Sequence, residues 1–297
     1  MTAMFKSLLA RLGASSTVAI PDALWEDTLA SLPFVARLDA AERARLRALA
    51  ERFLGEKEMA AAGGLELTAA MQVAIAVQAC LPILNLGLGW YRGWTSIVVY
   101  PGEFLVPREL TDDDGVVHQF VEPIAGEAWD GGPLLLSWDD AQRHDGELGL
   151  AYNVVIHEFT HKIDMLDGDA DGVPPFTRSS HPELDPQEWA ATLAEAFERF
   201  NAELELIELE LPPGLDPDDE AADRYYAHLP LDPYAGQDEG EFFAVSSEAF
   251  FVDPARLHAA FPDWYRQLAL FFKQDPLANA LSPDSAGEPK VKSGRSE

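Results

Sequence analysis

The segment HEFTHKID, residues 157–164, constrains the fold of this chain more than any other feature. On an α-helix, residues four apart differ by about 40° around the axis, so His157 and His161 point the same way and can bind one metal ion. Glu158 lies on the adjacent face, where a general base can reach a water molecule without being a ligand. The apolar flanks VVI and KIDML disfavour incidental histidines on an exposed helix. The pattern predicts a zinc site on a buried helix.

A catalytic zinc ion usually has three protein ligands and one open position, so a third ligand is needed. The compact arrangement would use Asp167, six residues after His161. That arrangement needs a chain-turning glycine where Asp164 stands, so we disfavour it. EFFAVSSEAFF is a better source, because Glu241 and Glu248 lie among apolar residues, seven apart on one helical face. The residues alone leave both glutamates open.

The charge of the chain narrows its class of partner. The 297 residues carry a formal net charge of −30, and so acidic a surface repels nucleic-acid phosphates and anionic lipid. We therefore predict no direct nucleic-acid binding and no membrane binding, with soluble small molecules or basic protein patches as partners. The single cysteine, Cys80, cannot form an internal disulfide, so the chain fits a reducing compartment, and we predict a cytoplasmic protein.

Two apolar segments resemble membrane or secretion elements. Residues 68–90 carry no charge and are long enough to span a bilayer, but they include Gln72, Gln78 and Pro82. We interpret this segment as a buried core helix that ends near Pro82. Residues 1–20 contain only a short apolar run broken by basic residues, so we interpret them as an N-terminal arm and not as a secretion signal.

The remaining periodicity predicts an α+β fold, mostly helical with a small β-sheet, in one zinc metallopeptidase-like domain over residues 21–280. The C-terminal tail, residues 281–297, is poor in apolar residues and is predicted to be disordered. Helices are expected at residues 22–62, 151–166, 186–210, 239–251 and 254–276, and strands at 95–101, 103–107 and 131–140.

Several segments together resemble a known family. HEFTHKIDMLDG, DPYAGQDEGEFFAVSSEAFF, LPILNLGLGWYRGWTSIVVYPGEF and FPDWYRQLALFFKQDP are similar to the Mlc titration factor A family of zinc metallopeptidases. These are gluzincin-like enzymes whose catalytic core is related to that of anthrax lethal factor. The likeness covers roughly residues 22–277. It implies a zincin-like fold and an aminopeptidase-like activity on small substrates.

The resemblance also implies roles for particular residues. It assigns one zinc ion per chain to His157, His161 and Glu241, with Glu158 as the catalytic base. It places a tyrosine seven residues before the ligand glutamate, and in this chain that residue is Tyr234. A phenol at that place could donate a hydrogen bond to the oxyanion as water attacks. A loop tyrosine packed on the core is the alternative.

Further side chains are expected to support this site. Glu248 becomes a second carboxylate that supports the ligands or the fold. Asp164, about 20° from His157 around the helix, could accept a proton from a ligand imidazole, or could instead cap the helix end. In zincins an edge strand upstream of the active helix pairs with an extended substrate. The candidates for that strand, with an ordinary sheet strand as the alternative, are Leu134, Leu135, Leu136, Ser137 and Trp138.

A second metal pattern occurs at DGDADG, residues 167–172. It matches the first half of an EF-hand calcium loop, but the position of the bidentate glutamate is occupied by Arg178. We interpret the segment as a tight acidic turn, with a calcium site as the less favoured alternative. The acidic stretch 201–223 is longer than the family resemblance leads us to expect, and we expect it to shape or screen the cleft.

The sequence thus supports two functions. The first is a zinc-dependent peptidase acting on a peptide or protein substrate, with a regulatory role in sugar-uptake control. The second is a non-catalytic binding protein that sequesters a transcription repressor, because the family is named for binding the repressor Mlc. An acidic surface suits a basic DNA-binding partner. The two roles can coexist in one chain.

Overall fold

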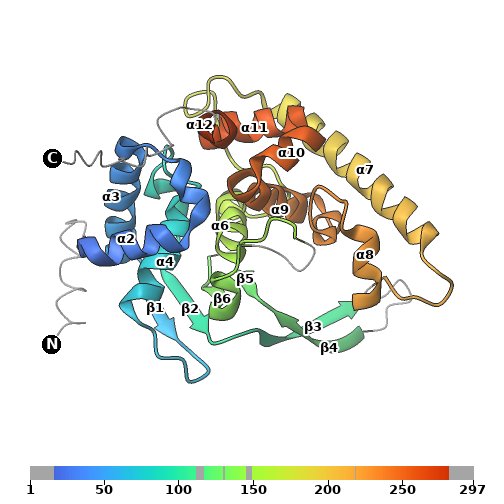
Figure 1. Cartoon of the computed structure of the whole chain (residues 1–297), viewed down its shortest axis with the longest axis horizontal. Helices are drawn as coiled ribbons and strands as arrows, with labels where there is room; N and C mark the ends of the chain where they lie inside the picture. The colour runs from blue at the N-terminus through green and yellow to red at the C-terminus, as the bar shows by residue number, and fades with distance from the viewer. Residues whose placement is uncertain (1–16, 112–116, 130, 145–148, 218, 281–297) are drawn as a thin grey trace, which may run out of the picture.

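The computed structural model describes residues 17–111, 117–129, 131–144, 149–217 and 219–280. Most of the predicted N-terminal arm and the whole C-terminal tail lie outside these residues. Figure 1 shows a helical body with a small sheet on one side and a β-hairpin that extends away from the sheet. The observed fold is a mostly helical α+β domain, as predicted.

The N-terminal part is helical, as expected, but it ends differently. The predicted helical region 22–62 divides into helices that stop at Glu56, and its last residues form a strand instead. Local preference favours a helix for EMAA, yet tertiary pairing with a neighbouring strand decides otherwise. The elements are α2 (Asp22–Ser31), η1 (Pro33–Arg37), α3 (Ala40–Glu56) and β1 (Glu58–Ala61).

The uncharged segment near residue 70 forms the core helix α4 (Ala69–Cys80), which ends just before Pro82, as predicted. Most of its side chains are buried, and Cys80 is a buried free thiol. Within the part of the chain that the structure describes, no helix has the length and apolar character needed to cross a membrane.

The main sheet has the strand order β1-β2-β6-β5. Its first three strands are parallel, and β5 runs antiparallel to β6. Strand β6 is therefore hydrogen-bonded on both sides, and β5 is an outer strand of this sheet. The new strands are β2 (Ser96–Tyr100), β5 (Gly126–Ala128) and β6 (Leu134–Ser137).

This topology corrects the substrate-strand prediction. Residues Leu134, Leu135, Leu136 and Ser137 form β6, which is an internal strand without a free edge, and Trp138 begins the short helix α5 (Trp138–Ala141). An extended peptide cannot pair with β6, because β2 and β5 already occupy both of its edges. Only strand order, which depends on contacts between distant segments, reveals this.

A separate antiparallel hairpin lies along the chain between β2 and β5 of the main sheet. It consists of β3 (Phe104–Thr111) and β4 (Val117–Ile124), and the chain passes from β4 almost directly into β5. The strand predicted at 103–107 is the first part of β3. The loop TDDDG, residues 111–115, has the composition of a turn, and its residues 112–115 lie outside the described residues.

The C-terminal helices enclose the active helix. Helix α6 (Val154–Asp164) packs against α9 (Glu239–Val252), and α7 (Pro186–Glu210) has its predicted bounds. An aromatic cluster around Trp189, Trp264 and Phe271 holds α7, α9 and α11 together. The other elements are η3 (Met165–Asp167), η4 (Glu220–Ala222), α8 (Asp223–Tyr226), η5 (Pro233–Gly236), α10 (Pro254–Ala260), α11 (Pro262–Phe272) and α12 (Pro276–Ala280).

Candidate active site

The active helix begins at a buried cap. The Asn153 side-chain oxygen accepts a hydrogen bond from the Ile156 amide at 2.9 Å, and its amide group donates to Gln78 of α4 at 2.8 Å. Asn153 therefore sets both where α6 starts and how it sits on α4. This cap explains why the helix starts later than the predicted residue 151. It fixes the position of the histidines one turn further along.

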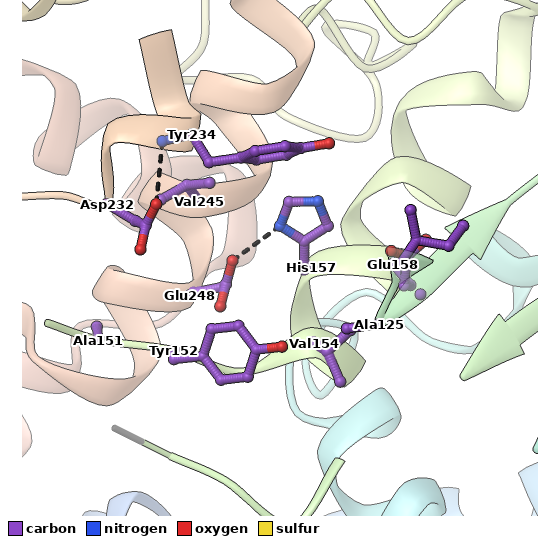
Figure 2. A pocket seen from close by; sticks show the side chains of 12 residues that line it. Ala125, Ala151, Tyr152, Val154, His157, Glu158, Asp232, Tyr234, Val245 and Glu248 are labelled. Carbon is purple, nitrogen blue, oxygen red and sulfur yellow. Dashed lines mark hydrogen bonds and ion pairs between the residues drawn. The ribbon is translucent and has the colours of Figure 1, made fainter. Parts of the chain in front are cut away.

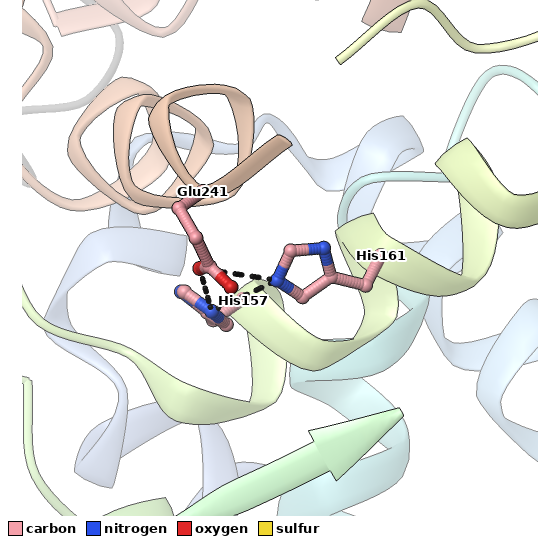
Figure 3. A group of neighbouring side chains, drawn as sticks. All are labelled: His157, His161 and Glu241. Atoms are coloured by element: carbon pink, nitrogen blue, oxygen red, sulfur yellow. Dashed lines mark hydrogen bonds and ion pairs between the residues drawn. The ribbon is translucent and has the colours of Figure 1, made fainter. Parts of the chain in front are cut away.

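Two imidazoles and one carboxylate converge above α6 (Figure 3). The Nε2 atoms of His157 and His161 are 3.1 Å apart, and Glu241 Oε2 lies 3.1 and 3.3 Å from them. Glu241 comes from the first turn of α9, where its amide donates to the capping Asp238 carboxylate at 2.9 Å. These are the three residues that the family resemblance implied as ligands.

The donor set fits one tetrahedral metal ion. Ligand atoms about 2.0–2.1 Å from such an ion are separated from one another by about 3.3–3.4 Å, close to the distances found here. Burial raises the pKa of Glu241, but hydrogen bonds from His157 and His161 outweigh this and hold its pKa below the usual range. Among the described residues, these three form the one such group that could hold a metal ion.

Glu248 lies behind the first histidine and not among the ligand atoms. The Oε1 atom of Glu248 is 2.8 Å from His157 Nδ1, and its Oε2 atom accepts a hydrogen bond from the backbone N–H of Asn153. Burial lowers the pKa of His157, but hydrogen bonds to Glu241 and Glu248 outweigh this and raise it well above its usual value. Of the two glutamates left open by the sequence, the structure thus brings Glu241 to the cluster and Glu248 to the opposite ring nitrogen.

Glu158 is buried beside β5. Only 5% of it is exposed, and this burial raises its pKa to about 7, although His157 and His161 oppose the rise. A Cβ atom placed on Gly126 would lie 2.5 Å from Glu158 Oε1, so glycine is needed at this point of the strand. The Oε2 atom of Glu158 is buried and has no hydrogen-bond partner among the described residues. The carboxyl group is therefore packed closely against the backbone of β5, and its Oε2 atom is a buried acceptor without a partner in the described part of the chain.

A cavity of about 290 Å³ lies over these groups. Ile124, Ala125 and Gly126 line it along the strand side, with Glu158 and His157 at its base. Figure 2 shows Tyr234 above the His157 ring, with its hydroxyl directed toward the side where Glu158 lies.

Tyr234 is held at the rim of this cavity by its own short helix. Its ring centroid is 6.0 Å from that of His157, the residue is 44% exposed, and its backbone amide donates to Asp232 at 3.0 Å. An exposed phenol close to the metal cluster can reach a bound substrate. The alternative of a tyrosine packed in the core does not fit this exposure.

The expected contact between Asp164 and a ligand histidine is wrong. Asp164 is fully buried and accepts a hydrogen bond from the Gly172 amide at 2.7 Å, which ties the DGDADG turn to the helix end. Burial raises its pKa to about 8, together with the nearby carboxylates of Asp171, Asp167 and Asp238. The alternative reading of Asp164, a residue that closes the end of the helix, matches this geometry.

The acidic turn 167–172 does not assemble a second metal site among the described residues. Its Asp171 carboxylate accepts a hydrogen bond from the Val173 amide at 3.0 Å, and the turn packs against the start of α9. A Cβ atom on Gly240 would lie 2.3 Å from the Ala170 carbonyl oxygen. The turn therefore supports the segment that carries Glu241.

Sequence reasoning missed Gly126, Tyr152 and Asp232, all of which line the cavity. Gly126 stands in PIAGEAW, where no periodic pattern marks a strand beside the active helix. Tyr152 precedes α6, and its hydroxyl donates to Asp140 at 3.3 Å. Asp232 was visible only as part of DPYAG, where its capping role was the sole local signal.

Comparison with known proteins agrees with this geometry. Residues 9–273 match the family described as glucose-regulated metallo-peptidase M90. Proteins called Mlc titration factor A are similar over most of their length. The one from Salmonella arizonae is 38% identical over 255 residues, covering 86% of this chain and 92% of the relative. Those from Salmonella gallinarum and Salmonella typhi are 37% identical over 252 residues, covering 85% of this chain and 86% of each relative.

Such a match extends far beyond the metal cluster, from the N-terminal helices to the end of α11. It includes the helix that carries His157 and His161 and the helix that carries Glu241. Both the share of the chain and the level of identity exceed what a common fold alone requires. The chain therefore belongs to the glucose-regulated metallo-peptidase M90 family.

Proposed function

We propose that this chain is a zinc-dependent peptidase that binds one zinc ion per molecule through His157, His161 and Glu241. The observation that carries the proposal is the convergence of two imidazole nitrogens and one carboxylate oxygen at 3.1–3.3 Å. Family membership implies a metal, and two nitrogens with one carboxylate oxygen form a donor set typical of catalytic zinc. An ion held there supplies Lewis acidity toward water and a carbonyl oxygen.

Glu158 is the proposed general base and acid. Its carboxylate accepts a proton from the attacking water and then gives it to the leaving amine nitrogen. A pKa of about 7 suits both transfers near neutral pH. Tyr234 donates its phenolic hydrogen bond to the oxyanion that develops on the carbonyl. Glu248 accepts the Nδ1 proton of His157, which leaves the Nε2 lone pair directed at the cluster.

The proposed substrate is an extended peptide or protein segment that pairs with β5. This strand is bonded to β6 on one side, and Gly126 brings its backbone against Glu158. Adding a strand there would satisfy backbone groups of the peptide and place a carbonyl beside the base. Strand β5 takes the role that the sequence suggested for residues 134–138. Aminopeptidase-like cleavage is part of the proposal through the family resemblance.

A regulatory role accompanies this activity in the proposal. The relatives are named for titrating Mlc, which supports an interaction of this chain with a repressor of that type in the cytoplasm. Binding without catalysis is the second candidate function. The formal net charge of −30 favours it, because a basic DNA-binding protein would be attracted to this surface.

Metal content tests the main proposal directly. Purified wild type is expected to carry about one zinc ion per chain by elemental analysis. Glu241→Ala should lose most of it, whereas Glu239→Ala, a change in the same helical turn outside the cluster, should keep it. Full zinc retention in Glu241→Ala would move the third ligand elsewhere. Wild type without zinc, even after reloading, would leave only the binding function.

Glu158→Gln separates the two candidate functions. We expect the glutamine side chain to reduce the rate of peptide cleavage at least about 10²- to 10⁴-fold, because its amide group cannot accept the proton of water. Zinc content and repressor binding should stay at the wild-type level. Loss of repressor binding in a folded, zinc-loaded variant would contradict the separation of the two roles.

A further inference from the structure

A second, larger cavity adjoins the metal site. Its volume is about 600 Å³, and it shares Tyr152, Asp232 and Tyr234 with the cavity over the metal cluster. Figure 2 shows Asp232 and Tyr152 on the side of His157 away from Glu158. A long substrate bound over His157 and Glu158 can therefore extend into this second space, which we call the acidic groove.

The lining of the acidic groove is strongly negative. Among the described residues that line it, one cation, Arg143, faces the carboxylates, but its guanidinium lies 3.5 Å from Asp140 and over the Tyr152 ring at 5.3 Å. Five carboxylates against one guanidinium leave four formal negative charges around the space. They come from segments far apart in the sequence and are Glu103, Asp140, Glu208, Asp223 and Asp232.

The same walls also carry apolar and aromatic surface. Leu204 and Pro217 line the groove together with the rings of Tyr152, Tyr226 and Tyr234. Lysine and arginine side chains bury their methylene stems on such surface, and their charged ends are attracted both to aromatic faces and to carboxylates. The combination of apolar walls and several carboxylates fits a long cationic side chain better than a neutral or acidic one.

Asp140 gives this groove a fixed anionic point. Its side chain is only 8% exposed, and it accepts hydrogen bonds from Ser137 Oγ at 2.5 Å and from Tyr152 at 3.3 Å. Tyr152 in turn lines the metal cavity, so the position of this carboxylate is tied to the active helix that follows. A cation bound in the groove would therefore lie close to the segment that leads into the active helix.

We propose that the acidic groove receives a lysine or arginine side chain of the peptide substrate, so that the enzyme selects basic peptides. This inference rests on the proposed peptidase function and deepens it by naming a substrate class. The metal, Glu158 and β5 carry out cleavage, while the groove determines which sequence is held there. Electrostatic attraction of this kind acts on both encounter and binding.

The test uses zinc-loaded protein and quenched fluorescent peptides that differ at one position. Each peptide pair has lysine or norleucine at that position, which changes the charge while keeping the aliphatic stem. The position is moved along the peptide in successive pairs. At one position, we expect lysine to raise kcat/KM about 10-fold over norleucine, and raising the salt concentration should reduce this ratio.

A double variant, Glu208→Gln with Asp223→Asn, tests whether the acidic groove is the source of the lysine preference. The lysine-to-norleucine ratio should fall toward one in this variant. Glu198→Gln, on the same helix α7 and outside the groove, should keep the wild-type ratio. Zinc content and circular dichroism report whether the double variant folds, and the salt dependence of wild type tests the idea if it does not.

The outcomes separate the two proposals. Cleavage of the norleucine peptides without any lysine preference would overturn the groove assignment and leave the peptidase function standing. A lysine preference that survives the double variant would also overturn it. No cleavage of any peptide by zinc-loaded wild type would instead contradict the peptidase function on which the groove assignment depends.

Discussion

At the scale of single residues, the site depends on carboxylates whose surroundings differ. Glu158 is buried with one oxygen that has no hydrogen-bond partner among the described residues, Glu241 faces two imidazoles, and Glu248 is held by an imidazole and a backbone amide. In the proposed function, the same functional group therefore serves as base, ligand and support. Burial and hydrogen bonding, which the sequence does not display, make the difference.

Glu248→Gln tests the supporting role. The amide can still accept from the Asn153 backbone, but it no longer offers a charged partner to His157 Nδ1. We expect zinc affinity to fall about 10- to 100-fold, measured by competition with a chelator, with little change in secondary structure. Ser247→Ala, a neighbouring buried change, serves as the control. Unchanged zinc affinity in Glu248→Gln would mean that His157 needs no such partner.

Asp164 predicts a pH dependence of stability. Its pKa is raised from 3.8 to about 8, so the folded protein holds a proton that the unfolded chain releases above about pH 4. The contribution of the protonated Asp164 carboxyl to stability is fully present below about pH 4 and is lost as the pH rises through about 8. Asp164→Asn should stabilise the protein at pH 8 by on the order of 1–3 kcal/mol, because asparagine can still accept from Gly172.

Denaturant unfolding at pH 5 and pH 8 measures this effect. The free energies of unfolding of wild type and Asp164→Asn should differ much less at pH 5, where Asp164 is protonated in the folded state. Equal stability of wild type and Asp164→Asn at both pH values would show that the buried carboxyl is solvated well enough to ionise freely. Because Asp164 contacts Gly172 and not the histidines, zinc content should not change.

At the scale of elements, the active site lies between α6, α9 and β5. Helix α6 supplies two ligand candidates and the proposed base, and α9 supplies the third ligand candidate from its first turn. The acidic turn after α6 packs on the start of α9 at Gly240, so the two helices are linked again beyond the cluster. Strand β5 completes the site because glycine lets its backbone approach Glu158.

Gly126→Ala tests the role of β5. The added methyl group would lie 2.5 Å from Glu158 Oε1, so the base or the strand must move. We expect at least about a 10-fold loss of kcat/KM while zinc content is kept, since about 1 Å of misplacement is costly to catalysis. Ala128→Ser on the same strand is the control. Full activity of Gly126→Ala would indicate that neither β5 nor Glu158 needs this spacing.

At the scale of the whole molecule, the candidate metal site joins two helices that lie far apart along the chain, α6 and α9. Glu241 lies 80 residues after His161 along the chain, so the ligand set exists only when α9 is packed on α6. Binding of zinc to the folded state alone must then stabilise the entire fold. The unfolded chain retains only the local pair of histidines.

Zinc should therefore raise the thermal midpoint. At free zinc 100 times the dissociation constant, the stabilisation is about 2.7 kcal/mol, or roughly 5–11 °C for a domain of this size. Scanning calorimetry of stripped wild type with and without zinc measures it. Glu241→Ala should show little of this shift. A shift of equal size in that variant would mean that the ion binds outside the proposed cluster.

The sequence by itself determined what depends on neighbours along the chain. The spacing of His157 and His161 placed both on one helix face, and local capping and periodicity predicted α7 with its observed bounds. The same rules failed for β1, where a helix-favouring segment became a strand because β2 provided a partner. Local patterns carry the helical period but not the identity of distant partners.

The tertiary structure decided the arrangements that depend on how a helix is rotated about its axis and on the order of the strands in the sheet. Glu241 and Glu248 share one face of α9 in sequence terms, yet the packing of α9 on α6 brings one to the imidazole Nε2 atoms and the other to Nδ1. Strand order made β6 internal and left β5 beside Glu158. These arrangements follow from contacts between segments far apart in the chain, which no local pattern of residues encodes.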